Sequence, residues 1–267
     1  MRFKLVFNSI PRLVITSLVF SVMLFPGRSW GQGNYWFELL TNQPQVSEAF
    51  YEGLFGWQIE PYQRDYWVIR HEDASIGGFM AVDGPLPDSQ DSLWLMALAV
   101  QDIDKSIELA LESGASVLRE PEVASMMPRI GVITDPTGVP IMLINTQHLG
   151  LTPAGAGTWA WAELWTDDVA RAREFYAEIP GVDIQAGTPR GHTVRVNGTP
   201  WASISPPALE TLSTAWMPHV EVEGIEAMTA RVVELGGKVL DGPTAVADGH
   251  RRSIIQDPVG AVIAIYE

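Results

Sequence analysis

Two glutamates occupy the same place in a short motif that occurs twice in this chain. Glu38 follows Trp36 by two residues, and Glu163 follows Trp161 by the same spacing. Side chains two apart on a strand point to the same face of a sheet, so each carboxylate should lie beside an indole ring. A carboxylate among large aromatic side chains is partly desolvated, which raises its pKa and suits it to act as a general base or as a hydrogen-bond acceptor for a ligand. The alternative is a structural glutamate bonded to the backbone or to an arginine.

A histidine distinguishes the second copy of this pattern from the first. His219 follows Met217 by two residues, so strand periodicity directs both side chains to the inward face, and the first copy has Ala97 at the equivalent position. Glu163 and His219 are therefore a candidate acid/base pair. Glu38 has no histidine at the equivalent position. A single strand histidine is also common as a buried residue with satisfied hydrogen bonds, and that interpretation stays open.

Arginines and tryptophans recur as well. Arg129 and Arg251 each precede an Asp-Pro turn by six residues. They could pair with the two glutamates or anchor an anionic ligand, and their recurrence favours structural pairing because a ligand anchor is needed only once. Tryptophans at matching places could form a pocket for a flat apolar ligand, although core packing explains each of them equally well. These tryptophans are Trp36, Trp94, Trp161 and Trp216.

A duplication positions these residues. The motif that starts at Trp36, with Phe50-Tyr51 and Gly56 after it, recurs 125 positions later, and the segment that ends in Asp135-Pro136 recurs at an offset of 122. A pattern held in register over such a length indicates two tandem modules. Two modules of this kind usually pack around a shared cleft, so we expect a site where their sheets curve together.

Each module should contain two βαβββ halves. Alternation of apolar residues predicts strands, a 3.6-residue period predicts helices, and Gly-Pro-rich stretches predict turns. In the first module the predicted strands are 35–40, 66–70, 76–82, 93–100, 130–134 and 140–144, the helices are 44–54 and 103–111, and the last two strands form a hairpin about the Asp135-Pro136-Thr137-Gly138 turn.

Together these motifs resemble the vicinal oxygen chelate superfamily, which includes glyoxalase I, bleomycin-resistance proteins and extradiol dioxygenases. The features that carry the resemblance are Phe-Tyr at the helix end, Val-x-Asp-Ile after a strand, a Leu-Glu-x-Gly helix end and the Asp-Pro-x-Gly hairpin, and they span residues 34–267. The resemblance implies an α+β fold in which curved mixed sheets form cup-like clefts, and it says little about chemistry because the fold hosts many reactions.

The resemblance implies that metal-dependent members hold the metal ion with two histidines and a glutamate in each cup. This chain has apolar side chains there, at Trp36, Leu95, Met142, Trp161, Met217 and Ala264. Such side chains offer a hard divalent ion no suitable donor, so we expect neither a metal ion nor any other cofactor. The chain is most similar to the two-repeat branch of the superfamily that lacks the metal ligands.

The N-terminus has the order of a signal peptide. Basic residues precede the apolar run 13–25, Pro26 follows, and Ser29 and Gly31 supply small residues for cleavage, whereas an apolar stretch of this length is short for a membrane span. We expect residues 1–31 to be a signal peptide, 32–147 and 159–267 to be the modules, and 148–158 to be the linker. The alternative is an uncleaved membrane anchor.

Composition limits the partners. The formal net charge is −15 and becomes −19 after cleavage, because residues 1–31 hold four basic residues and no acidic one. Such an acidic surface repels nucleic acid and anionic membranes. Without cysteine there is no disulfide and no thiol nucleophile.

The sequence therefore favours a secreted or periplasmic protein that binds a small organic ligand in a metal-free cleft, with no nucleic-acid or membrane partner and an undetermined oligomeric state. Catalysis is left open. Three classes compete: a metal-independent lyase, isomerase or hydrolase that uses Glu163 and His219, a sequestering module like the bleomycin-resistance proteins, and a metal enzyme of glyoxalase or dioxygenase type.

Overall fold

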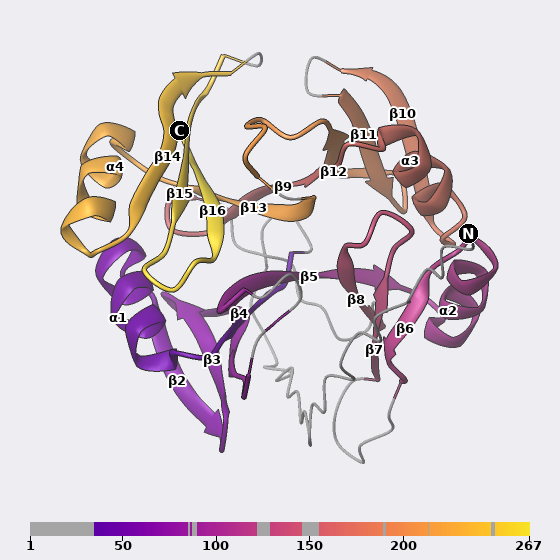
Figure 1. Ribbon diagram of the computed structural model, residues 1–267, viewed down its shortest axis with the longest axis horizontal. Helices are drawn as coiled ribbons and strands as arrows, with labels where there is room; N and C mark the ends of the chain where they lie inside the picture. The colour runs from indigo at the N-terminus through magenta and orange to yellow at the C-terminus, as the bar shows by residue number, and fades with distance from the viewer. Residues whose placement is uncertain are drawn as a thin grey trace, which may run out of the picture.

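The computed structural model describes residues 35–84, 86, 90–121, 129–145, 155–188, 191–212, 214–246 and 249–267. The predicted signal peptide and most of the predicted linker lie outside these residues. Within them the chain forms two eight-stranded mixed sheets, one per module, with two helices on each (Figure 1). No helix in this part of the chain is long and apolar enough to cross a membrane.

The first module contains eight strands and two helices. In chain order they are β1 (Phe37–Thr41), α1 (Pro44–Phe55), β2 (Gln58–Gln63), β3 (Tyr66–His71), β4 (Ala74–Ala81), β5 (Ser92–Val100), α2 (Ile103–Glu112), β6 (Ser116–Arg119), β7 (Ile130–Thr134) and β8 (Pro140–Asn145). The sequence of elements confirms two βαβββ units per module and the α+β fold class.

The second module repeats this order. Its elements are β9 (Trp159–Trp165), α3 (Val169–Ala177), β10 (Val182–Thr188), β11 (Gly191–Val196), β12 (Thr199–Ser205), β13 (Ala215–Glu221), α4 (Ile225–Glu234), β14 (Lys238–Ala245), β15 (Arg251–Gln256) and β16 (Val262–Tyr266).

The first strands of the two units join the halves of each sheet. β1 pairs antiparallel with β5 in the first module, and β9 pairs antiparallel with β13 in the second. The other strands of each unit extend the sheet outward, which gives the orders β2-β3-β4-β1-β5-β8-β7-β6 and β10-β11-β12-β9-β13-β16-β15-β14. Glu38 and Glu163 therefore lie on central strands.

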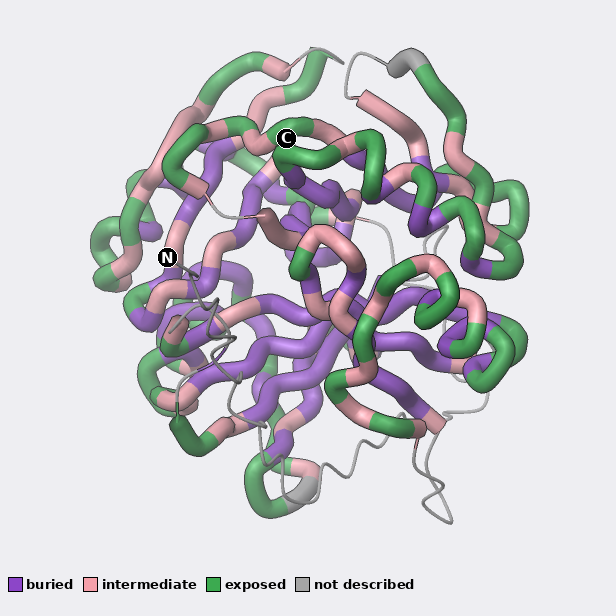
Figure 2. The backbone as a smooth tube through the Cα atoms, turned by 45° about the vertical axis from the view of Figure 1, so that its right-hand side comes forward, coloured by how far each residue is buried: buried purple, intermediate pink, exposed green. Residues whose placement is uncertain are grey.

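The two sheets pack through the faces that carry the helices. One continuous core holds side chains from both modules, and Trp57, Trp94 and Trp159 meet in it with ring centroids 5.1 to 6.2 Å apart. In Figure 1, α1 lies beside α4 and α2 lies beside α3, each pair drawn from both modules. The buried strands of both sheets meet along this layer in Figure 2. The opposite face of each sheet forms a cup, and the two cups point away from each other.

This arrangement corrects the expectation of a cleft shared by the modules. Aromatic side chains fill the space between the modules, because both sheets bury their helix-bearing faces there. The sheets curve within each module, and each cup belongs to one module alone. We call the faces that hold Glu38 and Glu163 the first cup and the second cup.

Candidate functional site

A cavity of about 280 Å³ lies in the second cup. The strands that form this cup are at the top of Figure 1. Strands β9, β11, β12, β13, β15 and β16 contribute to the wall of the cavity, together with the segments around them. Its lining residues are Glu163, Trp165, Gly191, Ser205, Pro206, Ala208, His219, Val246, Arg252 and Tyr266. Both members of the predicted acid/base pair are among them.

Strand register brings this pair together. Met217 lies opposite Glu163 on β13, and His219 lies opposite Trp161, so the histidine is the diagonal neighbour of the glutamate on the same face. The Nε2 atom of His219 lies 3.6 Å from Oε2 of Glu163, and both side chains are buried, with 1% and 7% of their surface exposed. Because both side chains are buried, the electrostatic interaction between them is stronger than it would be in water.

Glu163 has further partners. Ser205 donates a hydrogen bond to Oε1 at 2.9 Å, and Nη1 of Arg252 lies 3.3 Å from Oε2. The guanidinium carbon of Arg252 also lies 5.6 Å from the ring centre of Trp165, in cation–π contact.

These partners decide the ionisation of Glu163. Burial raises its pKa, but the hydrogen bond and the charge of His219, with hydrogen bonds from Trp165 and Ser205, outweigh burial and hold the pKa near 2. The sequence predicted a raised pKa for this carboxylate, and that prediction was wrong. Desolvation is the largest single effect, as expected, but the contacts with His219, Trp165 and Ser205 together exceed it.

Glu38 in the first cup has the opposite ionisation. It is fully buried, Trp36 donates to Oε1 from its indole at 2.6 Å, and the hydroxyl of Tyr66 donates to the same atom at 3.0 Å. Burial raises the pKa of Glu38 to about 8 against the smaller effects of these two hydrogen bonds. This carboxyl group is therefore predominantly neutral at pH 7, and apolar side chains such as Leu95 and Met142 surround it in the cup.

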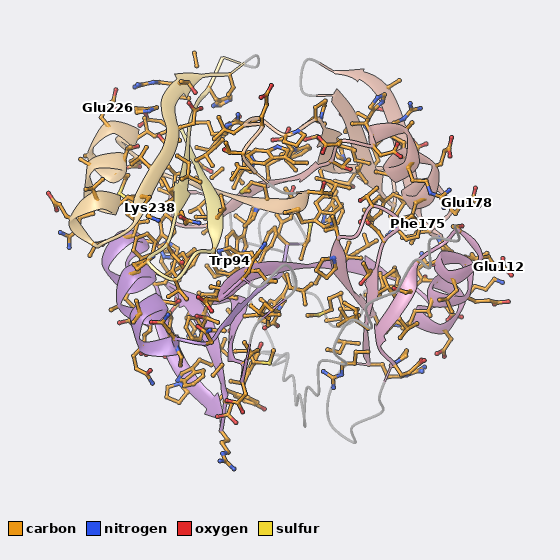
Figure 3. All side chains as sticks on the ribbon, viewed as in Figure 1. Trp94, Glu112, Phe175, Glu178, Glu226 and Lys238 are labelled. Carbon is orange, nitrogen blue, oxygen red and sulfur yellow. The ribbon has the colours of Figure 1, made fainter. Side chains whose placement is uncertain are left out.

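Not all predicted aromatic residues face the cups. Trp94 and Trp216 lie on the opposite side of their sheets, in the shared core, where their indoles donate to Tyr51 and Tyr176 at 3.0 Å. Figure 3 shows Trp94 between the two sheets. Their assignment to a ligand pocket was wrong. On each strand the next residue, Leu95 or Met217, faces the cup, so the tryptophan before it points to the opposite face of the sheet. Trp161 donates to Ser203 at 3.0 Å and is half-buried outside the cavity lining.

The recurrent arginines pair with helices. Arg129 contacts Asp104 with two hydrogen bonds of 2.6 and 2.7 Å, and Arg251 pairs with Glu226, in the first turns of α2 and α4. Glu226 lies on the outer side of α4 in Figure 3. Both arginines therefore pair with carboxylates on helices, and the pairing with Glu38 and Glu163 that the sequence suggested does not form.

Sequence analysis missed Arg252, Ser205, Trp165 and Tyr266. Arg252 follows Arg251 directly on β15, so strand alternation sends the two side chains to opposite faces and only Arg252 reaches the cup. Trp165 follows Glu163 by two residues, and that spacing was sufficient to predict it. Ser205 and Tyr266 have no comparable signal, since their contacts depend on strand pairing.

Comparison with known proteins identifies the family. The sequence model of the Glyoxalase/Bleomycin resistance protein/Dioxygenase superfamily matches residues 35–143 and 158–265. The chain belongs to this superfamily, as the tandem βαβββ units and the two cups also indicate.

Proteins with different names are similar to this chain in sequence or in fold. It is 25% identical over 242 residues to the "Putative glyoxylase CFP32" of Mycobacterium tuberculosis, covering 86% of this chain and 92% of the relative. It is 27% identical over 255 residues to the anthracycline biosynthesis protein DauV of Streptomyces sp., covering 87% and 92%. A solved structure of similar fold is the Mn(II)-bound glyoxalase of Novosphingobium aromaticivorans, with 15% identity, a TM-score of 0.60 and coverage of 86% of this chain and 80% of that one.

The residues in the cups do not fit the divalent metal ion of the metal-dependent members. Trp36, Leu95 and Met142 are packed in the apolar cluster of the first cup, and Met217 and Ala264 in that of the second. No group of three or more potential ligands occurs among the described residues. In the second cup, moreover, the guanidinium of Arg252 lies where a cation bound to Glu163 would be repelled.

Proposed function

We propose that the protein binds a small organic molecule in the second cup, without a metal ion, and that Glu163 and His219 act as a pair in which His219 exchanges a proton with that molecule. The observation that carries this proposal is the cavity that contains an ionised carboxylate, an imidazole and a guanidinium side by side. Glu163 holds and orients His219, whose ring is then placed to accept or donate a proton at the bound molecule. A metal-independent lyase or isomerase uses this chemistry.

A sequestering function is the second candidate. The family includes bleomycin-resistance proteins by name, and the cavity suits binding even without turnover. Incubation of a bound ligand in D₂O separates the two functions. If the wild type incorporates deuterium into the ligand and Glu163→Gln does not, the result supports catalysis. An unchanged ligand supports sequestration.

The binding site is tested by three variants. A ligand found by thermal-shift screening should bind more weakly to Glu163→Gln and His219→Ala, by about ten-fold or more, because each variant removes a charged or polar contact within the cavity. Glu38→Gln is the matched control, since it makes the same substitution in the other cup, where the carboxyl group is already predominantly neutral. Circular dichroism should show that all three variants are folded.

Equal losses of binding in Glu38→Gln and Glu163→Gln would show that these carboxyl groups support the duplicated fold and not a site. The binding-site assignment would then be wrong. The metal-free proposal has a separate test, in which chelator treatment leaves the melting temperature unchanged. About one tightly bound transition-metal ion per chain would contradict it and would support the metal-enzyme alternative.

We also propose that the protein is exported and that its mature N-terminus is Gln32. The charge, apolar and small-residue order of residues 1–31 supports this proposal. Intact-mass measurement of secreted or periplasmic material tests it, and a full-length chain retained in membranes would contradict it.

A further inference from the structure

We propose that the ligand of the second cup is a small planar carboxylic acid, bound as its carboxylate by Arg252 and His219 with its ring against Tyr266 and Pro206. This inference rests on the proposed function, because it names the ligand class of the same cavity. It depends on which hydrogen-bonding groups in the cavity are already used and which are left over.

The acceptor capacity of Glu163 is already used. A carboxylate has about four positions at which it accepts hydrogen bonds. Ser205 and Arg252 contact Glu163 at 2.9 and 3.3 Å, the Nε2 atom of His219 lies at 3.6 Å, and Trp165 donates a further hydrogen bond. A ligand that donates hydrogen bonds, such as an amine, therefore finds little free acceptor at Glu163.

Donor capacity is left over on Arg252. Its Nη1 contacts Glu163, whereas its Nε is buried and has no hydrogen-bond partner in the part of the chain that the structure describes. A guanidinium is always charged and presents paired N–H groups that match the two oxygens of a carboxylate. Only 16% of the side chain is exposed, so solvent screens its charge weakly.

The local charges favour an anion for the same reason. Arg252 balances Glu163, which is the only acidic residue among the described residues that line the cavity. The N–H groups of Arg252 that do not contact Glu163 attract an anionic ligand and repel a cationic one in a site of low dielectric. This local preference contrasts with the acidity of the protein as a whole, whose formal net charge is −15.

The walls of the cavity favour a small flat molecule. Tyr266 offers an aromatic side chain to it and Pro206 adds an apolar surface, whereas Trp165 is fully buried in contact with the guanidinium of Arg252. The volume of about 280 Å³ is at the lower limit of the roughly 300–1,000 Å³ typical of pockets for drug-sized ligands. A single-ring acid suits this space.

Matched acids and amides test the inference. Benzoate, salicylate and nicotinate are titrated against benzamide, salicylamide and nicotinamide, while NMR follows the imidazole signals of His219. We expect each acid to bind at least about ten-fold more tightly than its neutral amide, because only the acid pairs with Arg252. Arg252→Met should remove this preference, and Arg252→Lys should keep part of it because the charge is retained.

The control is Arg251→Met, which alters the neighbouring arginine that pairs with Glu226 outside the cup, and it should leave acid binding unchanged. Equal binding of acids and amides, or acid binding unaffected by Arg252→Met, would overturn the inference. In either case the binding of small molecules in the second cup, and so the proposed function, would stand. If neutral fragments reached His219 and no acid did, only the inference would fail, whereas silence of His219 toward every fragment would contradict both.

Discussion

At the scale of single residues, the same motif holds two carboxyl groups in opposite states. Glu38 has two neutral donors, Trp36 and Tyr66, so desolvation dominates and raises its pKa to about 8. Glu163 has His219 and Arg252, whose charges favour the carboxylate. The sequence predicted the shared face of each Trp-Glu pair but not these charges, because Arg252 comes from a strand 89 positions away.

The raised pKa of Glu38 makes a stability prediction. Below about pH 4.5 this carboxyl group is protonated in both the folded and the unfolded chain, and as the pH rises toward 8 only the unfolded chain ionises. The free energy of unfolding of the wild type should therefore fall between about pH 4.5 and 8. Glu38→Gln should remove this component and stabilise the protein at pH 8 by on the order of 1–3 kcal/mol, as measured by urea denaturation across this range.

Glu163→Gln is the comparison of opposite sign. A lowered pKa contributes stability above about pH 4.5 that is lost as the pH falls toward 2, and removal of the charge leaves Arg252 and His219 without their counter-ion. This variant should be less stable than the wild type at pH 7.

The Glu38 prediction would be contradicted by parallel stability profiles of the wild type and Glu38→Gln, which would show that Glu38 does not titrate between about pH 4.5 and 8.

At the scale of elements, the sequence predicted the strongly patterned segments and missed the irregular ones. Both helices of the first module and the hairpin of β7 and β8 are confirmed within one or two residues. β2 contains Pro61 and β14 contains Gly242-Pro243, which obscure the strand pattern, and β6 has only four residues. These strands form because neighbours pair with them, and that information is not local.

The Asp-Pro turns have a function that their sequence did not reveal. Oδ1 of Asp135 accepts hydrogen bonds from the backbone of its own turn, and Oδ2 accepts one at 2.8 Å from Tyr176 of the other module. Asp257 does the same within its turn, and Tyr51 of the first module bonds to it. The repeated Phe-Tyr and Asp-Pro motifs therefore link the modules reciprocally.

We expect Tyr51→Phe and Tyr176→Phe each to destabilise the protein by about 1–3 kcal/mol, because each removes a buried hydrogen bond to a carboxylate and leaves an indole N–H without its partner. Urea denaturation at pH 7 measures the change. Phe is isosteric with Tyr except for the hydroxyl, so packing is preserved. Loss from only one of the two variants would show that the links are not equivalent.

At the scale of the whole molecule, the duplication could be predicted and the packing of the two modules against each other could not. Motif repeats report which elements recur, but the face through which the modules pack depends on side chains from both. Tyr35 illustrates this point, since its hydroxyl donates to the carbonyl of Trp201 across 166 positions. The shared core fixes the cups on opposite sides of the molecule, and Arg252, His219 and the cavity belong to the second alone.

The shared core also predicts how the protein unfolds. Trp57 and Trp94 from the first module pack against Trp159 from the second, and the two reciprocal Tyr–Asp hydrogen bonds cross the same interface. Neither module buries these side chains alone, so we expect one cooperative transition, with equal calorimetric and van't Hoff enthalpies. Tyr176→Phe should shift this whole transition to lower temperature. Two resolved transitions, only one of which responds to Glu163→Gln, would instead show that the modules unfold independently and that the second cup is stable without its neighbour.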